Sequence, residues 1–364
     1  MAKEITQPLS SDRMAAFWFC GFALFAFVLY LLSGMLAPFV AGLAVAYFFD
    51  PVADRIEDAG LSRGLSAGVV ILTFLGLAAA ILILLFPLLQ GQVIGLVLRI
   101  PDLIEILRDR SQLVLELLNE KLSSGEIDNL QGAASYAGNI LGWLGGFLQD
   151  VWSGGLAFFN LLSLLIITPL VAFYLLRDWD KIVLRFDELL PRRSANIFRE
   201  QLSAIDDTIA AFVRGQAIVC LVLGIFYATG LTMAGLDFGL LVGLGTGLLA
   251  FIPYVGAAIG LSVGTGLALS QFSDWLPIVI VVAIFFIGQI SESYILTPRL
   301  VGGRVGLHPI WIIFSLLAGG ALFGFTGVLL AVPVTAVIGV LVRFATGRYL
   351  ESSLYGGGIS TKAK

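Results

Sequence analysis

Long apolar runs, separated by short polar stretches, dominate the chain. A run of about 20 apolar residues is long enough to cross the hydrocarbon core of a bilayer as an α-helix. The pattern therefore predicts an all-α integral membrane protein with about eight membrane segments, some of them short or broken. The predicted segments are residues 14–36, 39–49, 65–89, 156–176, 216–234, 238–269, 276–296 and 310–342.

Residues 1–90 are predicted to hold the N-terminal membrane helices. The apolar run at 14–36 is longer than the core of a secretory signal peptide, so we expect it to be retained. The shorter run at 39–49 ends at Asp50-Pro51, and proline disfavours helix at the residue before it. We therefore expect the two runs to form a tight hairpin near Pro38. Asp50 is expected to be solvated or to cap a segment end.

Residues 91–150 differ from the apolar runs on either side. Leucines and valines at spacings of three, four and seven between residues 99 and 122 predict an amphipathic helix. We predict an extramembrane helical subdomain on the extracytoplasmic side. Its pattern fits either a structural cap on the bilayer surface or a domain that binds a partner. Residues 151–176 then form a single membrane helix.

The distribution of basic residues predicts which loops are cytoplasmic. Lys and Arg are concentrated in the helical segment 177–214, and membrane proteins keep such loops on the cytoplasmic side. Arg299 and Arg304 place the loop 297–308 on the same side, and the tail 347–364 is also basic. Both termini are therefore predicted to be cytoplasmic.

A parity argument predicts two broken hairpins within a C-terminal membrane bundle at 215–346. Because the loop before 310–342 and the tail after it are both predicted to be cytoplasmic, this segment must turn back. By the same reasoning, 238–269 begins and ends on the outer face. Two Gly- or Pro-broken hairpins that enter from opposite faces are typical of transporters with a site near the midplane.

Composition narrows the class of protein further. The chain has 364 residues, of which 59% are hydrophobic and 13% charged, and its mean hydropathy is +0.99. A soluble protein carries about 25% charged residues. The net charge of −4 argues against nucleic acid as a partner. The sequence has no Walker-type phosphate-binding loop, so we do not expect the chain to hydrolyse ATP.

Neither a cofactor nor a metal site is predicted. Cys20 and Cys220 lie in apolar runs, where packing is the expected role, and the chain has one histidine. A hard cation held by carboxylates alone stays open.

Glu292 is the most unusual polar residue of the membrane pattern. A charge at the centre of a membrane helix costs roughly 2.5–3.5 kcal/mol on insertion scales, so we expect Glu292 to face protein or water. It either lines a pathway or forms a structural ion pair with Arg299 or Arg304. The predicted substrate or ion pathway residues are Glu292, Gln289, Pro253, Tyr254 and Gly320. The predicted gating positions at the hairpin bends are Gly256, Gly319, Gly324 and Gly327. His308 is either a junction residue or a proton relay.

One motif would point to an enzyme if its context agreed. The stretch Gly260–Gly264 matches G-x-S-x-G, the nucleophile elbow of hydrolases, with Ser262 at its centre. That elbow needs a strand before it and a helix after it, whereas this stretch lies in an apolar, Gly-rich run. With Gly256, the glycines form a small-residue ridge suited to helix packing. We therefore predict no catalytic residues and a protein that is not an enzyme.

Four stretches together resemble the autoinducer-2 exporter family of bacterial permeases. They are YFFDPVADRIEDAGLSRG at 47–64, FYLLRDWD at 173–180, GLLAFIPYVGAAIG at 247–260 and SESYILTPRLVGGRVGLHPIWIIFSLLAGGALFGFTGVLLAVP at 291–333. The resemblance covers nearly the whole chain in order. It implies a multi-pass α-helical protein of the bacterial inner membrane with a role in transport, exemplified by release of a polyhydroxylated quorum-sensing signal. It supplies no set of catalytic residues.

The expected function is a secondary transporter or permease that moves a small solute by alternating access, with an autoinducer-2-like solute as the model substrate. A proton or sodium ion is the expected coupling partner, and a homo-oligomer in the lipid bilayer is the expected assembly. One alternative is an ion-coupled antiporter or a passive channel for another small solute. Another is a membrane scaffold that transports nothing and acts through residues 91–150.

Overall fold

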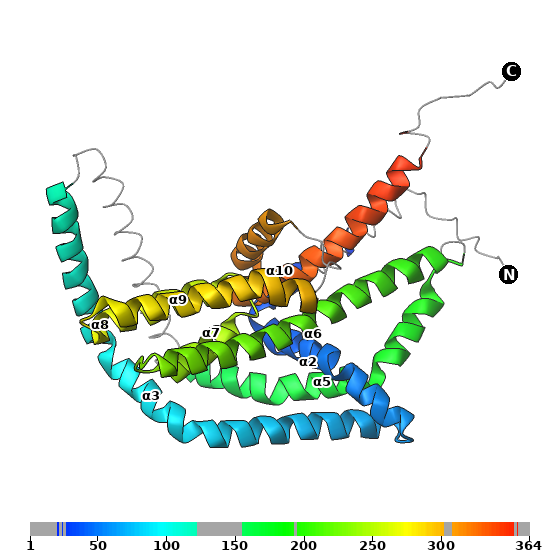
Figure 1. Ribbon diagram of the computed structural model, residues 1–364. Coiled ribbons are helices and arrows are strands. Elements are labelled where there is room, and N and C mark those ends of the chain that lie inside the picture. The colour runs from blue at the N-terminus through cyan, green and yellow to red at the C-terminus, as the bar shows by residue number, and fades with distance from the viewer. Residues whose placement is uncertain are drawn as a thin grey trace, which may run out of the picture.

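The computed structural model describes residues 20–21, 24, 27–121, 155–192, 195–301, 308–352 and 355. This part of the chain is helical and contains no strand, which confirms the predicted all-α class. Its elements are α2 (Ser33–Asp58), α3 (Arg63–Lys121), α5 (Gly155–Leu189), α6 (Ala195–Met233), α7 (Gly239–Leu249), α8 (Val255–Gln271), α9 (Trp275–Ser291), the π-helix η1 (Glu292–Val301) and α10 (Pro309–Leu350). Figure 1 shows α6 to α9 gathered side by side, with α3 curving beneath them.

The described helices have the lengths and apolarity of membrane spans. Five of them contain stretches long and apolar enough to cross a bilayer, and α7 and α8 are shorter apolar helices. The long stretches are Met35–Asp58, Arg63–Leu96, Ala195–Met233, Trp275–Val301 and Ile310–Leu350. The predicted multi-pass membrane protein is therefore confirmed.

The predicted hairpin near Pro38 is wrong, because α2 runs without interruption from Ser33 through both prolines to Asp58. Contacts with α5 stabilise α2 around Pro38, where proline alone would disfavour a helix. Thr168 donates a hydrogen bond of 3.2 Å to the carbonyl of Pro38. A Cβ at Gly42 would lie 2.8 Å from Val171, so the two helices approach closely. Packing therefore outweighs the local effect of proline, which removes one backbone donor.

The predicted subdomain boundary at residue 91 falls inside a continuous helix. Helix α3 has 59 residues, which at 1.5 Å per residue is about 88 Å, or roughly three times the hydrocarbon thickness. A helix of this length is compatible with an extramembrane segment, and the extracytoplasmic placement of residues 91–150 stays a prediction. Residues 122–154 lie outside the described residues, so the rest of the 91–150 subdomain stays a prediction.

The segment 238–269 is a hairpin, as predicted. Its two arms are α7, with 11 residues, and α8, with 17 residues, and the chain turns back at residues 250–254. The arms are about 16 and 25 Å long, and neither reaches across about 30 Å of hydrocarbon. Short connections join α7 to the end of α6 and α8 to the start of α9. The hairpin therefore begins and ends at the same end of these two long helices.

The segment 310–342 also turns back, at Gly324 inside α10. Gly324 has φ 58° and ψ −140°, a backbone conformation that a residue with a Cβ rarely adopts. Beyond the bend the chain returns along itself, so Gly319 lies against Gly327. The second arm continues to Leu350, eight residues past the predicted end.

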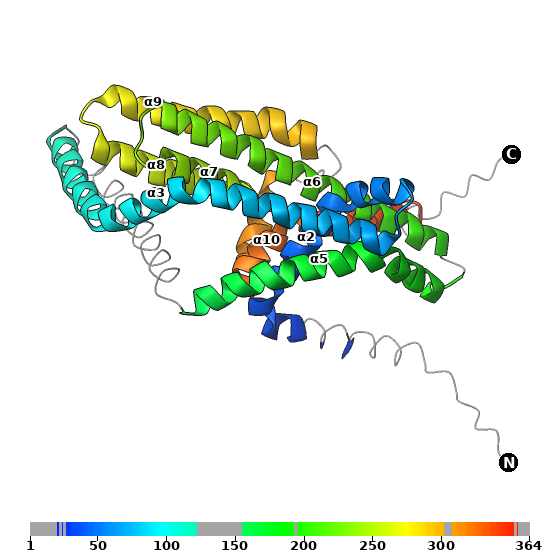
Figure 2. The same ribbon diagram turned by 90° about the horizontal axis from the view of Figure 1, so that it is seen from below.

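Buried apolar side chains of the described residues form three clusters. One cluster joins α6, α7, α8 and α9, and another joins α2, α3 and α5. A third joins α6, η1 and α10, with side chains of α2 packed against it. Figure 2 shows α6 and α9 along one edge and α5 along the other.

We predict that Gly247→Ala destabilises the protein by about 1–3 kcal/mol, because its new methyl group would overlap the backbone of Gly224 on α6. Gly245→Ala on the same helix is the matched control, since no atom lies within 4 Å of its Cβ position. Unfolding in a denaturant series measures both. Equal free energies of unfolding for the two variants would show that this approach does not limit packing.

The hairpin geometry also predicts the sidedness of its connections. Cysteines at Asp237→Cys and Ser273→Cys, in a background without Cys20 and Cys220, should react with an impermeant maleimide from outside intact cells. Arg348→Cys, beyond the second hairpin, should react only after permeabilisation. Labelling of positions 237 and 273 from opposite sides would contradict a hairpin that enters and leaves on one face.

Candidate functional site

Glu292 lies at the junction of α9 and η1, within the apolar stretch Trp275–Val301. The residue is 6% exposed, and its side chain forms no hydrogen bond or ion pair within the described part of the chain. Arg299, on the same π-helix, does not pair with it, and Arg304 lies outside the described residues. Burial of an ionised carboxylate without a cation is costly, so Glu292 requires a proton, a cation or water.

Helix α6 presents further polar side chains to this core. Gln216, Cys220 and Tyr227 follow one another at spacings of four and seven, which places them along one helix face. Cys220 and Tyr227 both lie within electrostatic range of the Glu292 carboxylate. Sequence reasoning missed all three as site residues, although a glutamine at the start of an apolar run is a visible signal.

Gln216 connects α6 to the bend of the first hairpin. Its side chain is buried and its Nε2 donates a hydrogen bond of 2.5 Å to the carbonyl of Ala250. Pro253 and Tyr254 follow within the same bend, and Tyr254 is half-exposed with φ 68°. Gly256 packs directly against Ala250 and so closes the bend. One face of α6 therefore reaches both the bend and the surroundings of Glu292.

The remaining predicted pathway residues are arranged differently. Gln289 of α9 donates a hydrogen bond of 3.1 Å to Ser293, one turn further along in η1. Gly320 lies in the second hairpin, where its neighbour is Val328 of the same hairpin. Helix α10 packs on α6 and α2, whereas α9 packs on α6, α8 and η1. Around Gly319, Gly320 and Gly327 the nearest atoms belong to the second hairpin itself, and Gly324 has no atom within 4 Å of its Cβ position, so none of these glycines packs against Glu292.

His308 precedes α10 as its N-cap residue. Its Nδ1 accepts a hydrogen bond of 3.4 Å from the backbone N–H of Ile310, and its side chain is exposed. This contact fits a junction residue, and the proton relay stays a prediction.

The G-x-S-x-G stretch lies within helix α8. Ser262 donates a hydrogen bond of 2.7 Å to the carbonyl of Ala258 in the preceding turn. Gly260 and Gly264 both lie against the ring of Phe285 on α9. The glycines therefore serve helix packing, as the small-residue ridge predicts. Among the described residues, no cluster of three or more His, Cys, Asp or Glu side chains could hold a metal ion.

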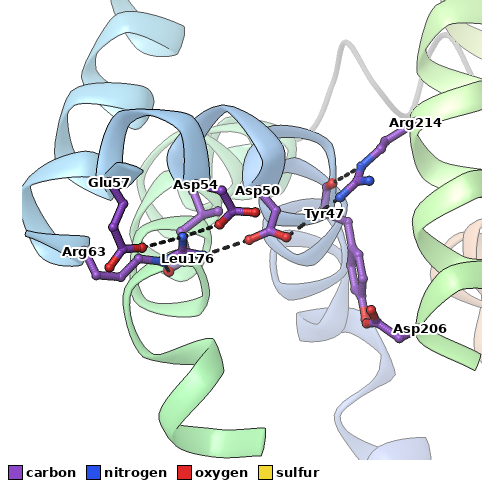
Figure 3. A network of polar contacts seen from close by, with 8 residues as sticks. All are labelled: Tyr47, Asp50, Asp54, Glu57, Arg63, Leu176, Asp206 and Arg214. Carbon is purple, nitrogen blue, oxygen red and sulfur yellow. Dashed lines mark hydrogen bonds and ion pairs between the residues drawn. The ribbon is translucent and has the colours of Figure 1, made fainter. Parts of the chain in front are cut away.

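A second polar group lies where α2, α3 and α5 meet, and Figure 3 shows it around Arg63. The guanidinium donates to Asp50 at 2.8 Å, to Asp54 at 2.5 Å and to Glu57 at 3.1 Å. It also donates to the carbonyl of Leu176 on α5 at 2.8 Å. Asp50 is thus an ion-pair partner that helps to tie three helices together, where the sequence predicted a solvated or capping residue.

The same group continues across to α6. The hydroxyl of Tyr47 donates to Asp206 at 2.8 Å, and Arg214 donates to the carbonyl of Tyr47 at 2.9 Å. Arg214 lies 3.8 Å from Asp50. A small hollow of about 40 Å³, partly open to solvent, lies among these side chains and Trp179. We call these residues and the Arg63 cluster the junction network. The contacts of Tyr47 with Asp206 and Arg214 join residues 159 and 167 positions apart, so no local pattern predicts them.

Past the predicted membrane segment 156–176, α5 carries charged residues that form ion pairs with one another. Arg177 lies 2.6 Å and Lys181 2.8 Å from Asp178. These two cations lower the pKa of Asp178 to about 2, so its carboxylate stays ionised over the physiological range.

We predict that Arg63→Met destabilises the fold by about 1–3 kcal/mol, because it leaves Asp50, Asp54 and Glu57 without their shared cation. These carboxylates are one-third to one-half exposed, which keeps the effect below that of a fully buried pair. Lys181→Met removes an exposed cation and should leave the free energy of unfolding unchanged. A loss no larger for Arg63→Met than for this control would show that the network contributes nothing to stability.

Comparison with known proteins identifies the family. A family model described as AI-2E family transporter matches residues 19–347. The protein named "Putative transport protein YrrI" of Bacillus subtilis (strain 168) is 31% identical over 312 residues, which cover 84% of this chain and 85% of that protein. The protein named "Putative permease PerM" of Escherichia coli (strain K12) is 26% identical over 319 residues, covering 87% and 89%. The chain therefore belongs to the AI-2E family of membrane transporters.

Proposed function

We propose that this protein is a secondary transporter that moves a small solute across the bacterial inner membrane by alternating access. Membership of a transporter family supports the permease role. The proposed solute is small and polyhydroxylated, like autoinducer-2, and export in quorum sensing is the proposed setting. Glu292 carries the coupling proton or orients a hydroxyl group of the solute.

The single observation that carries this proposal is the burial of Glu292 without a cationic partner in the described chain. Ionisable residues inside membrane bundles that lack a structural partner mark ion or substrate pathways. A carboxylic acid that is neutral when buried and ionised when hydrated can carry one proton as the site opens from one side to the other.

The first hairpin supports the same mechanism. Because α7 and α8 are too short to span the bilayer, their bend lies at membrane depth, and irregular backbone there must be held by protein or line a cavity. Gln216 satisfies one carbonyl of this bend, at Ala250. A π-helix begins at Glu292, and π-helical turns occur often at functional sites.

An ion-coupled antiporter or a passive channel for another solute are the alternatives within the same class. An antiporter would use Glu292 in the same way, with flux that follows an imposed proton or sodium gradient. A passive channel would conduct without such dependence. A scaffold that acts through residues 91–150 would move no solute, and deletion of that subdomain from a chain that still folds would separate it from the transport functions.

We predict that Glu292→Gln reduces gradient-driven flux in proteoliposomes by about tenfold or more and removes its dependence on pH, because an amide cannot carry a proton. Uptake and efflux are measured across a pH series, with imposed proton and sodium gradients and a solute panel that includes autoinducer-2.

Glu200→Gln is the matched control, because Glu200 is an exposed residue near the start of α6. It should transport as the wild type does. Undiminished flux for Glu292→Gln at every pH would exclude Glu292 from coupling. Failure of the wild type to move any solute of the panel, from folded protein, would favour the scaffold.

A further inference from the structure

Tyr227 places a buried hydroxyl in the apolar cluster that joins α6, α7, α8 and α9. The residue is 0% exposed, and its hydroxyl has no hydrogen-bond partner among the described protein groups. Buried hydroxyls in native proteins are almost always bonded, and each exception calls for an explanation such as a functional role or a bound water. A phenylalanine would fill the same space at no such cost, so the hydroxyl itself needs a reason.

The packing of α9 leaves space for this hydroxyl. The ring of Tyr227 lies against the ring of Phe285, with centroids 5.2 Å apart. Its hydroxyl points at Gly288, where any Cβ would overlap the phenol. Gly288 is therefore the residue that lets the hydroxyl enter the interface between α6 and α9.

Glu292 lies one helical turn beyond Gly288. The backbone N–H of Glu292 bonds to the carbonyl of Gly288, so the two residues are neighbours on one side of the helix. Glu292 is 6% exposed as a residue, and Tyr227 lies within electrostatic range of its carboxylate. Two buried polar groups without protein partners thus occupy the same interface.

Neighbouring elements do not supply the missing partners. On α6, besides Tyr227, Cys220 lies within electrostatic range of Glu292, and its thiol is a weak donor. On α9, Gln289 is bonded to Ser293, and on η1 the exposed Arg299 makes no bond to Glu292. On α8, the hydroxyl oxygen of Thr265 is also buried without a hydrogen bond among the described residues. A phenol and a carboxyl that lack protein partners in one interface are the donor and acceptor set that a single water can join.

We propose that Tyr227 and Glu292 together bind one ordered water molecule at the α6–α9 interface. The phenol donates to the water, and the water donates to the carboxyl group of Glu292. Within the proposed transport function, on which this role rests, Tyr227 is a positioning residue that keeps the proton-carrying carboxyl hydrated while α6 and α9 remain closed. Gly288 is the structural requirement for this arrangement.

Infrared difference spectroscopy of the reconstituted full chain tests the water site without any transport assay. The carboxyl C=O band of Glu292 is assigned by its loss in Glu292→Gln. In Tyr227→Phe this band should shift, and a water O–H band that moves in H₂¹⁸O should disappear. Tyr174→Phe is the matched control, since Tyr174 lies half-exposed on α5, and it should change neither band.

Unfolding gives a second, independent measurement. If a water bridges the two groups, Tyr227→Phe removes a bonded hydroxyl and raises the unfolding equilibrium constant about fivefold, the equivalent of ~1 kcal/mol. An unchanged Glu292 band together with a more stable Tyr227→Phe protein would overturn the proposal, because an unbonded hydroxyl is better removed. A wild type that transports nothing but shows both bands would refute the proposed function and leave the water site standing.

Discussion

The close approach of α6 and α7 is the contact on which the rest of the membrane core depends. At Gly224 and Gly247 the two backbones meet with no side chain between them. Because lipid tails are as apolar as leucine, helices in a bilayer associate through such close packing rather than through the hydrophobic effect. This contact holds the short hairpin of α7 and α8 against the long helix α6. The bend of the hairpin therefore lies within hydrogen-bond reach of Gln216. The polar face of α6 and the carboxyl of Glu292 are then enclosed in one core.

The sequence predicted the fold where local chemistry decides it. Gly324 and the bend around Pro253 interrupt apolar runs, and both runs do turn back there. It failed at Pro38 and Pro51, where the same local rule is overridden by packing on α5 and by the bonds of Arg63. A proline inside a helix removes one donor, which a close contact with a neighbouring helix outweighs. Only the three-dimensional neighbours distinguish a proline that ends a helix from one that does not.

The candidate site was predictable only in part, for a related reason. Glu292 stands out because it is a charge within an apolar segment, and its burial agrees with that signal. Tyr227 does not stand out, since a tyrosine in an apolar run is ordinary, and its importance arises from Gly288 on another helix. The junction network is invisible for the same reason: Tyr47 and Asp206 are 159 residues apart. The hydrophobic pattern of the sequence identifies a single unusual residue such as Glu292. It does not identify the residues on other helices that lie beside it and complete a site.

The contrast between the two polar groups decides which of them is the better candidate for chemistry. In the junction network, each carboxylate of the Arg63 cluster has a cation within 3.1 Å, and its side chains reach water. Such an arrangement already has its lowest-energy partners and serves to hold helices together. Glu292 and Tyr227 are buried, and neither side chain has a hydrogen-bond partner within the described part of the chain. Binding of a proton, water or solute lowers the free energy of these two buried groups. A site whose free energy depends on its ligand in this way can couple binding to a conformational change.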